Sequence, residues 1–277
     1  MIDLDQFKVR PGSKVRLADI DASGTAGLGS KSDGAEILGS NIQRLEELQA
    51  RLHAENRRSL LVVLQGLDTS GKDGTTRAVF TGVNPNGVDV HSFGRPGPEE
   101  LDHDYLWRVH RRVPNRGVIG VFNRSQYEDV LIARVEKLVP KSTWSRRYRH
   151  INEFERMLVD EGTTIIKCFL HISPDEQMER LESRIETPRK NWKIEPADFE
   201  ARARWNDYVR AYEDVMEKCS TDSAPWWIVP ANRKWVRNAV VSEIVRNALE
   251  NMDPKYPDGE HDLDEIRHLA AKARIID

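Results

Sequence analysis

The chain has 277 residues, enough for one large domain with a sizeable core, and its 42 Lys and Arg residues are balanced by 45 Asp and Glu residues. The net charge of −3 gives no support to a general polyanion binder, so any basic surface must be local. Two cysteines are too few for a disulfide framework, no stretch approaches the roughly 20 apolar residues of a membrane span, and the start of the chain does not resemble a secretory leader, so we expect a soluble cytoplasmic protein.

The first predicted element is an amphipathic helix over residues 36–58, in which leucine and isoleucine recur at helical spacing. Residues 1–35 before it are rich in Asp, Gly and Ser, which predicts a segment that wraps over the surface or is partly mobile, with no catalytic role. We expect the helix to pack on the domain that follows it.

A glycine loop follows the apolar run LLVVLQ, which begins at Leu60. The loop reads GLDTSGKDG. A strand, a glycine loop and a helix start in this order are typical of a phosphate-binding P-loop, because glycines let backbone amides turn toward an anion and the helix dipole and a lysine add positive charge. We predict that phosphate oxygens are bound by residues of this loop and helix start, namely Gly66, Thr69, Ser70, Gly71, Lys72, Asp73 and Gly74.

Two carboxylates depart from the common P-loop pattern. Asp73 stands where most P-loops carry a Ser or Thr hydroxyl for magnesium, and Asp68 lies inside the loop. The sequence therefore predicts that acid side chains hold the metal. The alternative interpretation of the whole stretch is an ordinary glycine-rich turn with a surface lysine.

Strand and helix patterns alternate through the rest of the chain. Further strands are predicted at 88–93, 117–122, 164–171 and 226–229, and helices at 99–113, 125–136, 142–161, through a long region ending at Cys219, and at 234–250. This alternation predicts a single α/β domain with a parallel sheet covered on both faces. The charged tail over residues 251–277 is interpreted as a docking helix or an oligomer contact.

The loop NRSQYEDV follows the strand at 117–122. In a parallel sheet this loop lies beside the P-loop, because the carboxyl ends of neighbouring strands converge. Many P-loop enzymes carry a magnesium-linked acid where this chain has Asn123, so Glu128 or Asp129 is predicted to restore the missing charge, and Arg124 to bind phosphate oxygens. The alternative for the two acids is a solvated helix face.

Two further segments carry local positive charge. Arg146 and Arg149 share one face of the helix at 142–161, close to Lys141, and predict a track for an extended polyphosphate or nucleotide, with a merely solvated face as the alternative. The segment RIETPRKNWKIEP, with two prolines that interrupt the helix pattern, predicts a movable basic lid over about 184–205. Its cations are Arg184, Arg189, Lys190 and Lys193, and Trp192 among them either stacks on a base or packs.

Taken together, the motifs GLDTSGKDGTT, GVNPNGV, EELDHDYLWR, VFNRSQYEDVL, RYRHINEFE and RIETPRKNWK resemble the polyphosphate kinase 2 family over about Leu38 to Ala248. The resemblance implies a fold similar to thymidylate kinases: a P-loop kinase-like parallel sheet sandwiched by helices, with a helical lid. It also implies phosphate transfer between inorganic polyphosphate and adenine nucleotides, with guanine as an alternative base, without a covalent enzyme intermediate. Mg²⁺ is the implied cofactor, with Mn²⁺ as an alternative, and a homo-oligomer, either a dimer or a tetramer, is the implied assembly.

The resemblance also implies roles for single residues. Asp68 becomes a metal-linked carboxylate and Lys72 a phosphate clamp, Arg124 and Glu128 fall in the second motif with Glu128 as a further metal ligand, and Arg184 matches the lid arginine. The pairing of Asn123 with Glu128 is similar to the class that accepts monophosphates and diphosphates, which implies conversion of AMP to ADP and onward to ATP. One motif departs from the family: Phe93, Gly94, Arg95 and Pro96 stand where relatives have a lysine, which leaves Arg95 as the candidate phosphate ligand there.

The implied reaction needs no protein nucleophile and no general base, since the acceptor phosphate oxygen is already anionic. Two rival functions remain open from the sequence. One is an ATP-dependent nucleoside monophosphate kinase, which shares the P-loop and lid, and the other is a non-catalytic polyanion-binding module that uses Arg146, Arg149 and the lid. We expect neither nucleic acid nor membrane as a partner.

Overall fold

The computed structural model describes residues 2–259 and 261–273. Met1, Glu260 and residues 274–277, which belong to the predicted terminal segments, lie outside the described residues. One sheet of five parallel strands forms the centre, in the order β2-β3-β1-β4-β5. The strands are β1 Ser59–Gln65, β2 Val88–Ser92, β3 Ile119–Asn123, β4 Thr163–His171 and β5 Trp226–Pro230.

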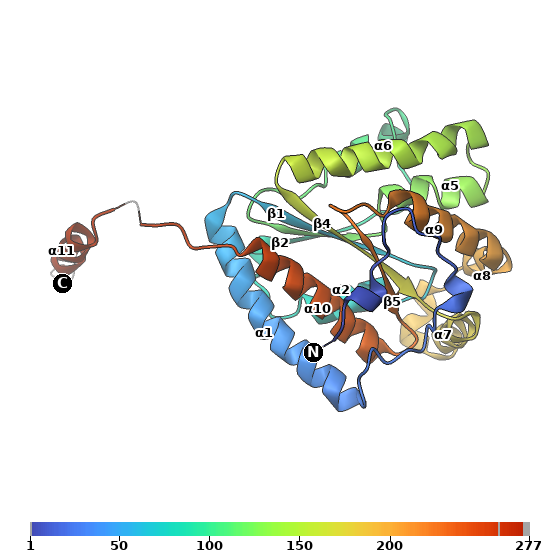
Figure 1. Ribbon diagram of the computed structural model, residues 1–277, viewed down its shortest axis with the longest axis horizontal. Coiled ribbons are helices and arrows are strands. Elements are labelled where there is room, and N and C mark those ends of the chain that lie inside the picture. The colour runs from blue at the N-terminus through green and yellow to red at the C-terminus, as the bar shows by residue number, and fades with distance from the viewer. Residues whose placement is uncertain (1, 260, 274–277) are drawn as a thin grey trace.

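Helices cover both faces of the sheet (Figure 1). The described α-helices are α1 Lys31–Glu55, α2 Lys72–Val79, α3 Pro98–Leu101, α4 Trp107–His110, α5 Ile132–Val135, α6 Lys141–Asp160, α7 Pro174–Glu186, α8 Pro196–Ala203, α9 Trp205–Cys219, α10 Lys234–Met252 and α11 Leu263–Ala273. Short 3₁₀ helices are η1 Asp5–Phe7, η2 Leu17–Asp19, η3 Pro85–Gly87, η4 Gln126–Asp129 and η5 Pro188–Lys193.

Two hydrophobic cores lie on opposite sides of the sheet, because side chains alternate along each strand. Leu60, Val62 and Leu64 of β1 join the core beneath α1, α2 and α10, whereas Leu61 and Val63 join the core beneath α6 and α9. All seven residues of β1 are buried, as a central parallel strand with helices on both faces requires. The P-loop therefore follows a strand that is buried along its whole length.

The strand order brings the P-loop and the loop after β3 together. β1 pairs with β3 in parallel, with Leu64 opposite Asn123, and the backbone amide of Arg124 donates to the carbonyl of Leu64 over 3.0 Å. The two loops predicted to meet thus leave neighbouring strands at the same edge of the sheet.

Three predicted helices differ from the structure. The stretch at 99–113 forms two short helices, α3 and α4, because Asp104 accepts a hydrogen bond from the amide of Leu106 and starts a new turn. The stretch at 125–136 divides into η4 and α5, and the Ser125 hydroxyl accepts from the amide of Tyr127 at the start of η4. The long region ending at Cys219 divides into α7, η5, α8 and α9, with Pro188 and Pro196 at the new starts.

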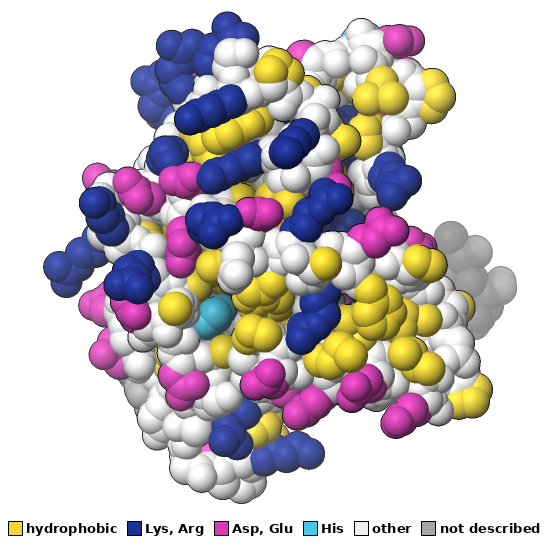
Figure 2. All heavy atoms as spheres, turned by 90° about the vertical axis from the view of Figure 1, so that its right-hand side faces the viewer, with side chains coloured by type: hydrophobic (Ala, Val, Ile, Leu, Met, Phe, Trp, Pro, Cys, Tyr) yellow, Lys and Arg dark blue, Asp and Glu magenta, His cyan; other side chains and the backbone are white. Residues whose placement is uncertain are grey.

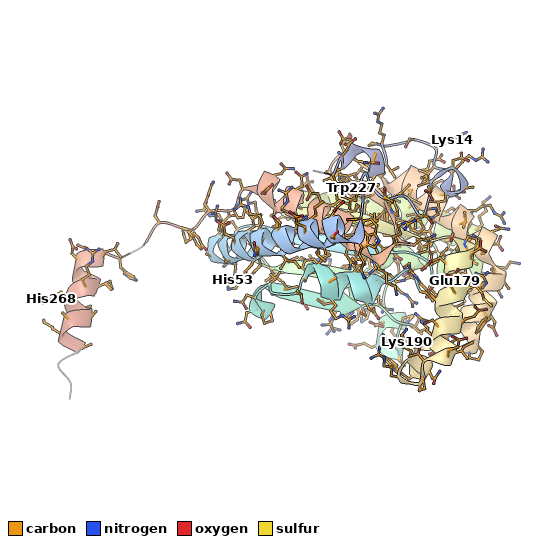
Figure 3. All side chains as sticks on the ribbon, turned by 90° about the horizontal axis from the view of Figure 1, so that it is seen from below. Lys14, His53, Glu179, Lys190, Trp227 and His268 are labelled. Atoms are coloured by element: carbon orange, nitrogen blue, oxygen red, sulfur yellow. The ribbon has the colours of Figure 1, made fainter. Side chains whose placement is uncertain are left out.

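The N-terminal segment lies across β5 and α9. The amide of Val9 donates to the carbonyl of Trp226 over 2.8 Å, the Ser220 hydroxyl donates to the Val9 carbonyl over 2.6 Å, and the amide of Leu17 donates to Glu213 over 2.8 Å. Figure 3 shows Lys14 and Trp227 on this same side of the molecule. Backbone groups of the segment are therefore paired with the domain rather than left to solvent.

The C-terminal helix α11 stands apart from the sheet and its covering helices, with His268 far from the other labelled residues (Figures 1 and 3). Its Leu263, Ile266 and Leu269 side chains are exposed. Whether this helix docks or joins an oligomer contact stays a prediction. Over the described residues, no helix is both long enough and apolar enough to cross a membrane.

Two glycines of α1 make a matched test of its packing. A Cβ on Gly39 meets nothing within 4 Å, whereas a Cβ on Gly34 lies 2.5 Å from Cε3 of Trp235 in α10. We expect Gly39→Ala to raise the free energy of unfolding by about 0.5–1 kcal/mol, because alanine favours a helix. Gly34→Ala should lower it by about 1–3 kcal/mol through overpacking. Urea unfolding followed by circular dichroism compares them, and equal stability of the two variants would contradict the packing of α1 on α10.

Candidate active site

The P-loop runs from Gly66 to Gly71 between β1 and α2, and its glycines are required by close contacts as well as by conformation. Gly66 and Gly71 have φ of 153° and 97°, values that L side chains rarely adopt. A Cβ on Gly66 would lie 2.8 Å from the Leu170 carbonyl oxygen, and one on Gly71 would lie 1.9 Å from Nη1 of Arg237. Side chains at either position would push the loop off the elements behind it.

Lys72, the first residue of α2, bridges the loop. Its Nζ donates to the carbonyl oxygens of Gly66 at 2.8 Å and Leu67 at 3.4 Å, and the side chain is buried. Burial, together with the nearby Arg124 guanidinium, lowers the pKa of Lys72 to about 8. Keeping this buried lysine charged therefore costs free energy, and an anion bound in the loop would offset that cost.

Arg124 and Asp68 form an ion pair across the two loops. Nη2 of Arg124 donates to Oδ1 of Asp68 over 2.9 Å, and Arg124 has a left-handed backbone with φ of 62°. Burial opposes the charge of Arg124, yet Glu128 and Asp68 together raise its pKa above the usual value. The predicted metal-linked carboxylate and the predicted phosphate-binding arginine are thus in direct contact.

Asp73 joins three parts of the site. Its Oδ1 accepts from Nδ2 of Asn123 at the end of β3, and its Oδ2 lies 3.6 Å from Nζ of Lys193 in η5. The acid at the position usually held by a hydroxyl therefore connects the P-loop helix, the neighbouring strand and the lid.

Glu128 lies in η4, beside Arg124 but away from the cleft surface. Burial raises the pKa of Glu128, while the charges of Arg124 and Lys72 act in the opposite direction. The other acid of the pair, Asp129, is bound by Arg147, whose Nη1 donates to Oδ1 of Asp129 over 2.9 Å, and burial raises the pKa of Asp129 to about 6. Of the two acids, Glu128 is the one whose charge acts on the P-loop lysine.

A cleft of about 770 Å³ opens over the P-loop and carries a large excess of positive charge. Its lining includes two carboxylates, Asp68 and Asp73, and nine cations: Lys72, Arg77, Arg124, Arg180, Arg184, Lys190, Lys193, Lys234 and Arg237. Such a lining favours a ligand with several negative charges. Sequence reasoning missed Arg77, Arg180, Lys234 and Arg237; the spacing of Arg180 four residues before Arg184 on α7 was a usable signal for the second of these.

Arg180 and Arg237 hold the P-loop from behind. Nη1 of Arg180 donates to the carbonyls of Thr69 and Ser70 at 2.8 and 3.2 Å, and Nη1 of Arg237 donates to Ser70 at 3.2 Å. Burial, with Arg180 nearby, lowers the pKa of Arg237 to about 10. These arginines fix loop carbonyls in place, so they are positioning residues.

Polar contacts hold the predicted lid segment to the end of α7 and to itself. Nη1 of Arg184 donates to the carbonyl of Lys193 over 3.2 Å and lies 3.6 Å from Asp198, and Nζ of Lys190 donates to the Ser183 hydroxyl over 3.2 Å. Figure 3 shows Lys190 at the end of the molecule that also carries Glu179 of α7. The Trp192 side chain is 77 % exposed, which is against the interpretation that it packs in the protein.

Of the predicted ligands, Gly66, Ser70 and Glu128 lie outside the described cleft lining, and so do four arginines: Arg95, Arg146, Arg149 and Arg189. All four are exposed, and Nε of Arg149 lies 3.7 Å from Glu153. Figure 2 shows Lys and Arg side chains gathered over the upper part of the face on which α6 begins. The track along α6 stays a prediction.

The oxygen donors in the cleft fit a hard divalent cation. Within residues 2–259 and 261–273, no group of three or more His, Cys, Asp or Glu side chains is arranged to hold a metal by itself. Mg²⁺ is commonly held by one or two carboxylates together with phosphate oxygens and water, and Asp68 and Asp73 supply two carboxylates at the P-loop.

The comparison with known proteins matches this geometry. A family model described as polyphosphate kinase 2 (PPK2) matches residues 29–257. The chain belongs to the polyphosphate kinase 2 family. PPK2 kinases are phosphotransferases that generally need a divalent metal. The family and the P-loop kinase-like fold class predicted from the sequence are thereby confirmed.

Individual PPK2 relatives are similar over nearly the whole chain. An AMP/ADP-polyphosphate phosphotransferase of Meiothermus ruber is 50 % identical over 258 residues, which are 93 % of this chain and 97 % of the relative. An ADP-polyphosphate phosphotransferase of Rhodopseudomonas palustris is 42 % identical and covers 93 % of each chain. The crystal structure of polyphosphate kinase 2 from Arthrobacter aurescens TC1 has a TM-score of 0.91, 42 % identity and 95 % coverage of both chains.

The lowered pKa of Lys72 predicts how anion binding depends on pH. An anion in the P-loop favours the charged lysine, so binding takes up a proton once the pH passes about 8. Below that pH, protonation of Lys72 should not affect the dissociation constant of tripolyphosphate. Above it, we expect the dissociation constant to rise by up to about tenfold per pH unit. Lys72→Arg should remove this rise, because arginine stays charged. Titration calorimetry compares the proteins, and identical slopes would show that another group is responsible.

Proposed function

We propose that this PPK2 chain transfers the terminal phosphoryl group of inorganic polyphosphate to AMP and ADP, giving ADP and ATP. The proposal is supported by membership of the family and by the two relatives at 50 % and 42 % identity, which are named as AMP/ADP- and ADP-polyphosphate phosphotransferases. The observation that carries it is the cleft over the P-loop, whose lining includes nine cations and only two carboxylates. An extended phosphate chain is the kind of donor that uses so many cations at once.

An ATP-dependent nucleoside monophosphate kinase is less well supported. Such an enzyme binds a base on its donor as well as on its acceptor. The aromatic residue in the described cleft lining, Phe93, packs edge-on against Phe122 and is covered by the guanidinium of Arg108 at 5.2 Å. It leaves no open face on which a donor base could stack.

The described side chains suit in-line transfer. Lys72 and the P-loop amides neutralise the transferring phosphoryl group, Arg124 binds its oxygens from the neighbouring strand, and Arg184 and Lys193 bring further charge from the lid. Closing the lid limits the access of water, which favours the nucleotide acceptor over hydrolysis. Mg²⁺ or Mn²⁺ would be held by Asp68, with Asp73 as the other carboxylate of the cleft lining, and would supply positive charge to the phosphate groups when bound. Glu128 stays a predicted metal ligand, and it lies outside that lining. The acceptor oxygen is already anionic, so no general base is required.

Finer features belong to the same proposal. The acceptors are adenine nucleotides, with guanine nucleotides as an alternative, and Asn123 with Glu128 is the pairing linked to use of both monophosphates and diphosphates. The chain forms one phosphotransferase domain with a lid over about 184–205. The protein acts in the cytoplasm as a homo-oligomer. Arg146 and Arg149 extend the path of the donor chain beyond the cleft.

The direct test is synthesis of ATP by the purified chain from Mg²⁺, long-chain polyphosphate and either AMP or ADP, with no ATP added. ATP formed from both acceptors is the expected result. ATP from ADP alone would restrict the acceptor class, and ADP formed only from AMP plus ATP would replace the proposal by the ordinary kinase. Salt-sensitive polyphosphate binding with no turnover would favour a binding module.

Two substitutions test the roles of single cations. We expect Lys72→Ala and Arg184→Ala each to lower kcat by about 100-fold or more, since both groups are placed to stabilise charge in the transition state. Arg267→Ala is the matched control, because Arg267 lies on the separate helix α11 and pairs only with Asp264 among its described salt bridges. Steady-state rates with polyphosphate and ADP decide between the roles, and near-normal turnover of either cleft variant would remove that residue from the mechanism.

A further inference from the structure

A fully buried ion pair lies in the core on the α6 side of the sheet. Nζ of Lys167 on β4 lies 2.6 Å from Oε2 of Glu155 on α6, and their side chains are 0 % and 2 % exposed. Nζ of Lys167 also donates to the carbonyl of Cys219 over 2.6 Å. Removing two charges from water is costly, and buried pairs of this kind can often be replaced by apolar residues with little loss of stability. Stability alone therefore does not account for the pair.

The other oxygen of Glu155 holds the loop that follows β3. Oε1 accepts from Nε2 of Gln126 at 2.9 Å and from the hydroxyl of Tyr127 at 2.7 Å, and that hydroxyl in turn accepts from Nζ of Lys167 at 3.0 Å. Gln126 and Tyr127 are both buried. They are consecutive residues and lie between Arg124 and Glu128 in the sequence. One buried carboxylate thus anchors the segment that joins two proposed functional residues.

The backbone at Arg124 needs such an anchor. Its φ of 62° is uncommon for a residue with a side chain and costs on the order of 1 kcal/mol or more unless the surroundings fix it. Upstream, the amide of Arg124 is held by the Leu64 carbonyl. Downstream, Nε2 of Gln65 donates to the Ser125 hydroxyl over 3.2 Å, and the next two residues are held by Glu155. The left-handed turn that directs Arg124 toward Asp68 is therefore clamped on both sides.

We propose that Glu155, buried with Lys167 as its counter-charge, is a positioning residue for catalysis: its Oε1 holds Gln126 and Tyr127, so that Arg124 meets Asp68 and Glu128 lies beside them. The proposal rests on the proposed function. Neither member of the pair lines the described cleft, so each acts through the loop and not on the substrate. Lys167 supplies the counter-charge in the core, and the Oε1 atom of Glu155 holds Gln126 and Tyr127.

Two double variants separate positioning from stability. Glu155→Gln/Lys167→Met removes both charges but keeps an amide oxygen that accepts from Gln126 and Tyr127. Glu155→Leu/Lys167→Met removes the acceptor as well. We expect the Leu/Met variant to lose about tenfold or more in kcat with KM for polyphosphate changed less than about threefold, because misplaced groups cost turnover more than binding. The Gln/Met variant should recover most of that loss at a similar melting temperature.

A second buried polar cluster supplies a matched control. Nδ2 of Asn41 on α1 donates to the Ser242 hydroxyl at 3.0 Å and to Oε2 of Glu243 at 2.9 Å on α10, on the opposite face of the sheet. Asn41→Leu damages a buried network that touches neither catalytic loop. At a comparable loss of melting temperature, it should leave kcat per folded molecule unchanged.

Hydrogen exchange gives a readout that does not depend on turnover. Amides of residues 126–131 should exchange faster in the Leu/Met variant than in the wild type, and not in Asn41→Leu. If the wild-type chain makes no ATP from polyphosphate, the proposed function fails, while exchange in this loop still tests the clamp. If the wild type is active and the Leu/Met variant keeps its kcat and its exchange rates, or if Gln/Met loses as much turnover as Leu/Met, the positioning role is overturned.

Discussion

The burial of several cations close together at the carboxyl end of β1 is the constraint on which the rest of this site depends. Burial and neighbouring charge lower the pKa values of Lys72, Lys234 and Arg237, so the protein holds these groups against their preference for water. Backbone carbonyls of the P-loop relieve part of this cost, since Lys72, Arg180 and Arg237 all donate to them. The same hydrogen bonds hold the P-loop carbonyls in place, so the cations that concentrate charge in the cleft also set the conformation of the loop.

The two faces of the sheet support two halves of the site. The P-loop is held from the α10 side by Arg237, while the loop after β3 is held from the α6 side through Glu155. Both supports reach the same edge only because β1 and β3 are adjacent parallel strands. Helix α6, which contributes no residue to the described cleft lining, thereby helps to determine where its functional groups point.

Local patterns were sufficient to predict the strands and the P-loop, because glycine spacing is visible within a few residues. The contact of Asn123 with the P-loop helix followed from the general rule that loops at the carboxyl ends of neighbouring parallel strands converge. Long-range partners were beyond local patterns: Arg180 and Arg237 reach loop carbonyls 111 and 167 residues away. The break of the helix at 99–113 coincides with a hydrogen bond from the amide of Leu106 to the Asp104 side chain, which competes with helix continuation without changing the apolar period. Lys167 did carry a signal, since a lysine inside TTIIKCFLH must be buried if the strand is covered on both faces.

The contact between Lys193 and Asp73 couples the lid to the charge state of the cleft. The two side chains are 39 % and 70 % exposed, and such solvent-screened pairs contribute only about 0–1 kcal/mol. A phosphate arriving at the P-loop is a stronger partner for Lys193 than this half-exposed carboxylate. The ion pair between Lys193 and Asp73 is therefore weakened by rising ionic strength. A bound phosphate would replace Asp73 as the partner of Lys193, so that the same lysine holds the segment to the ligand.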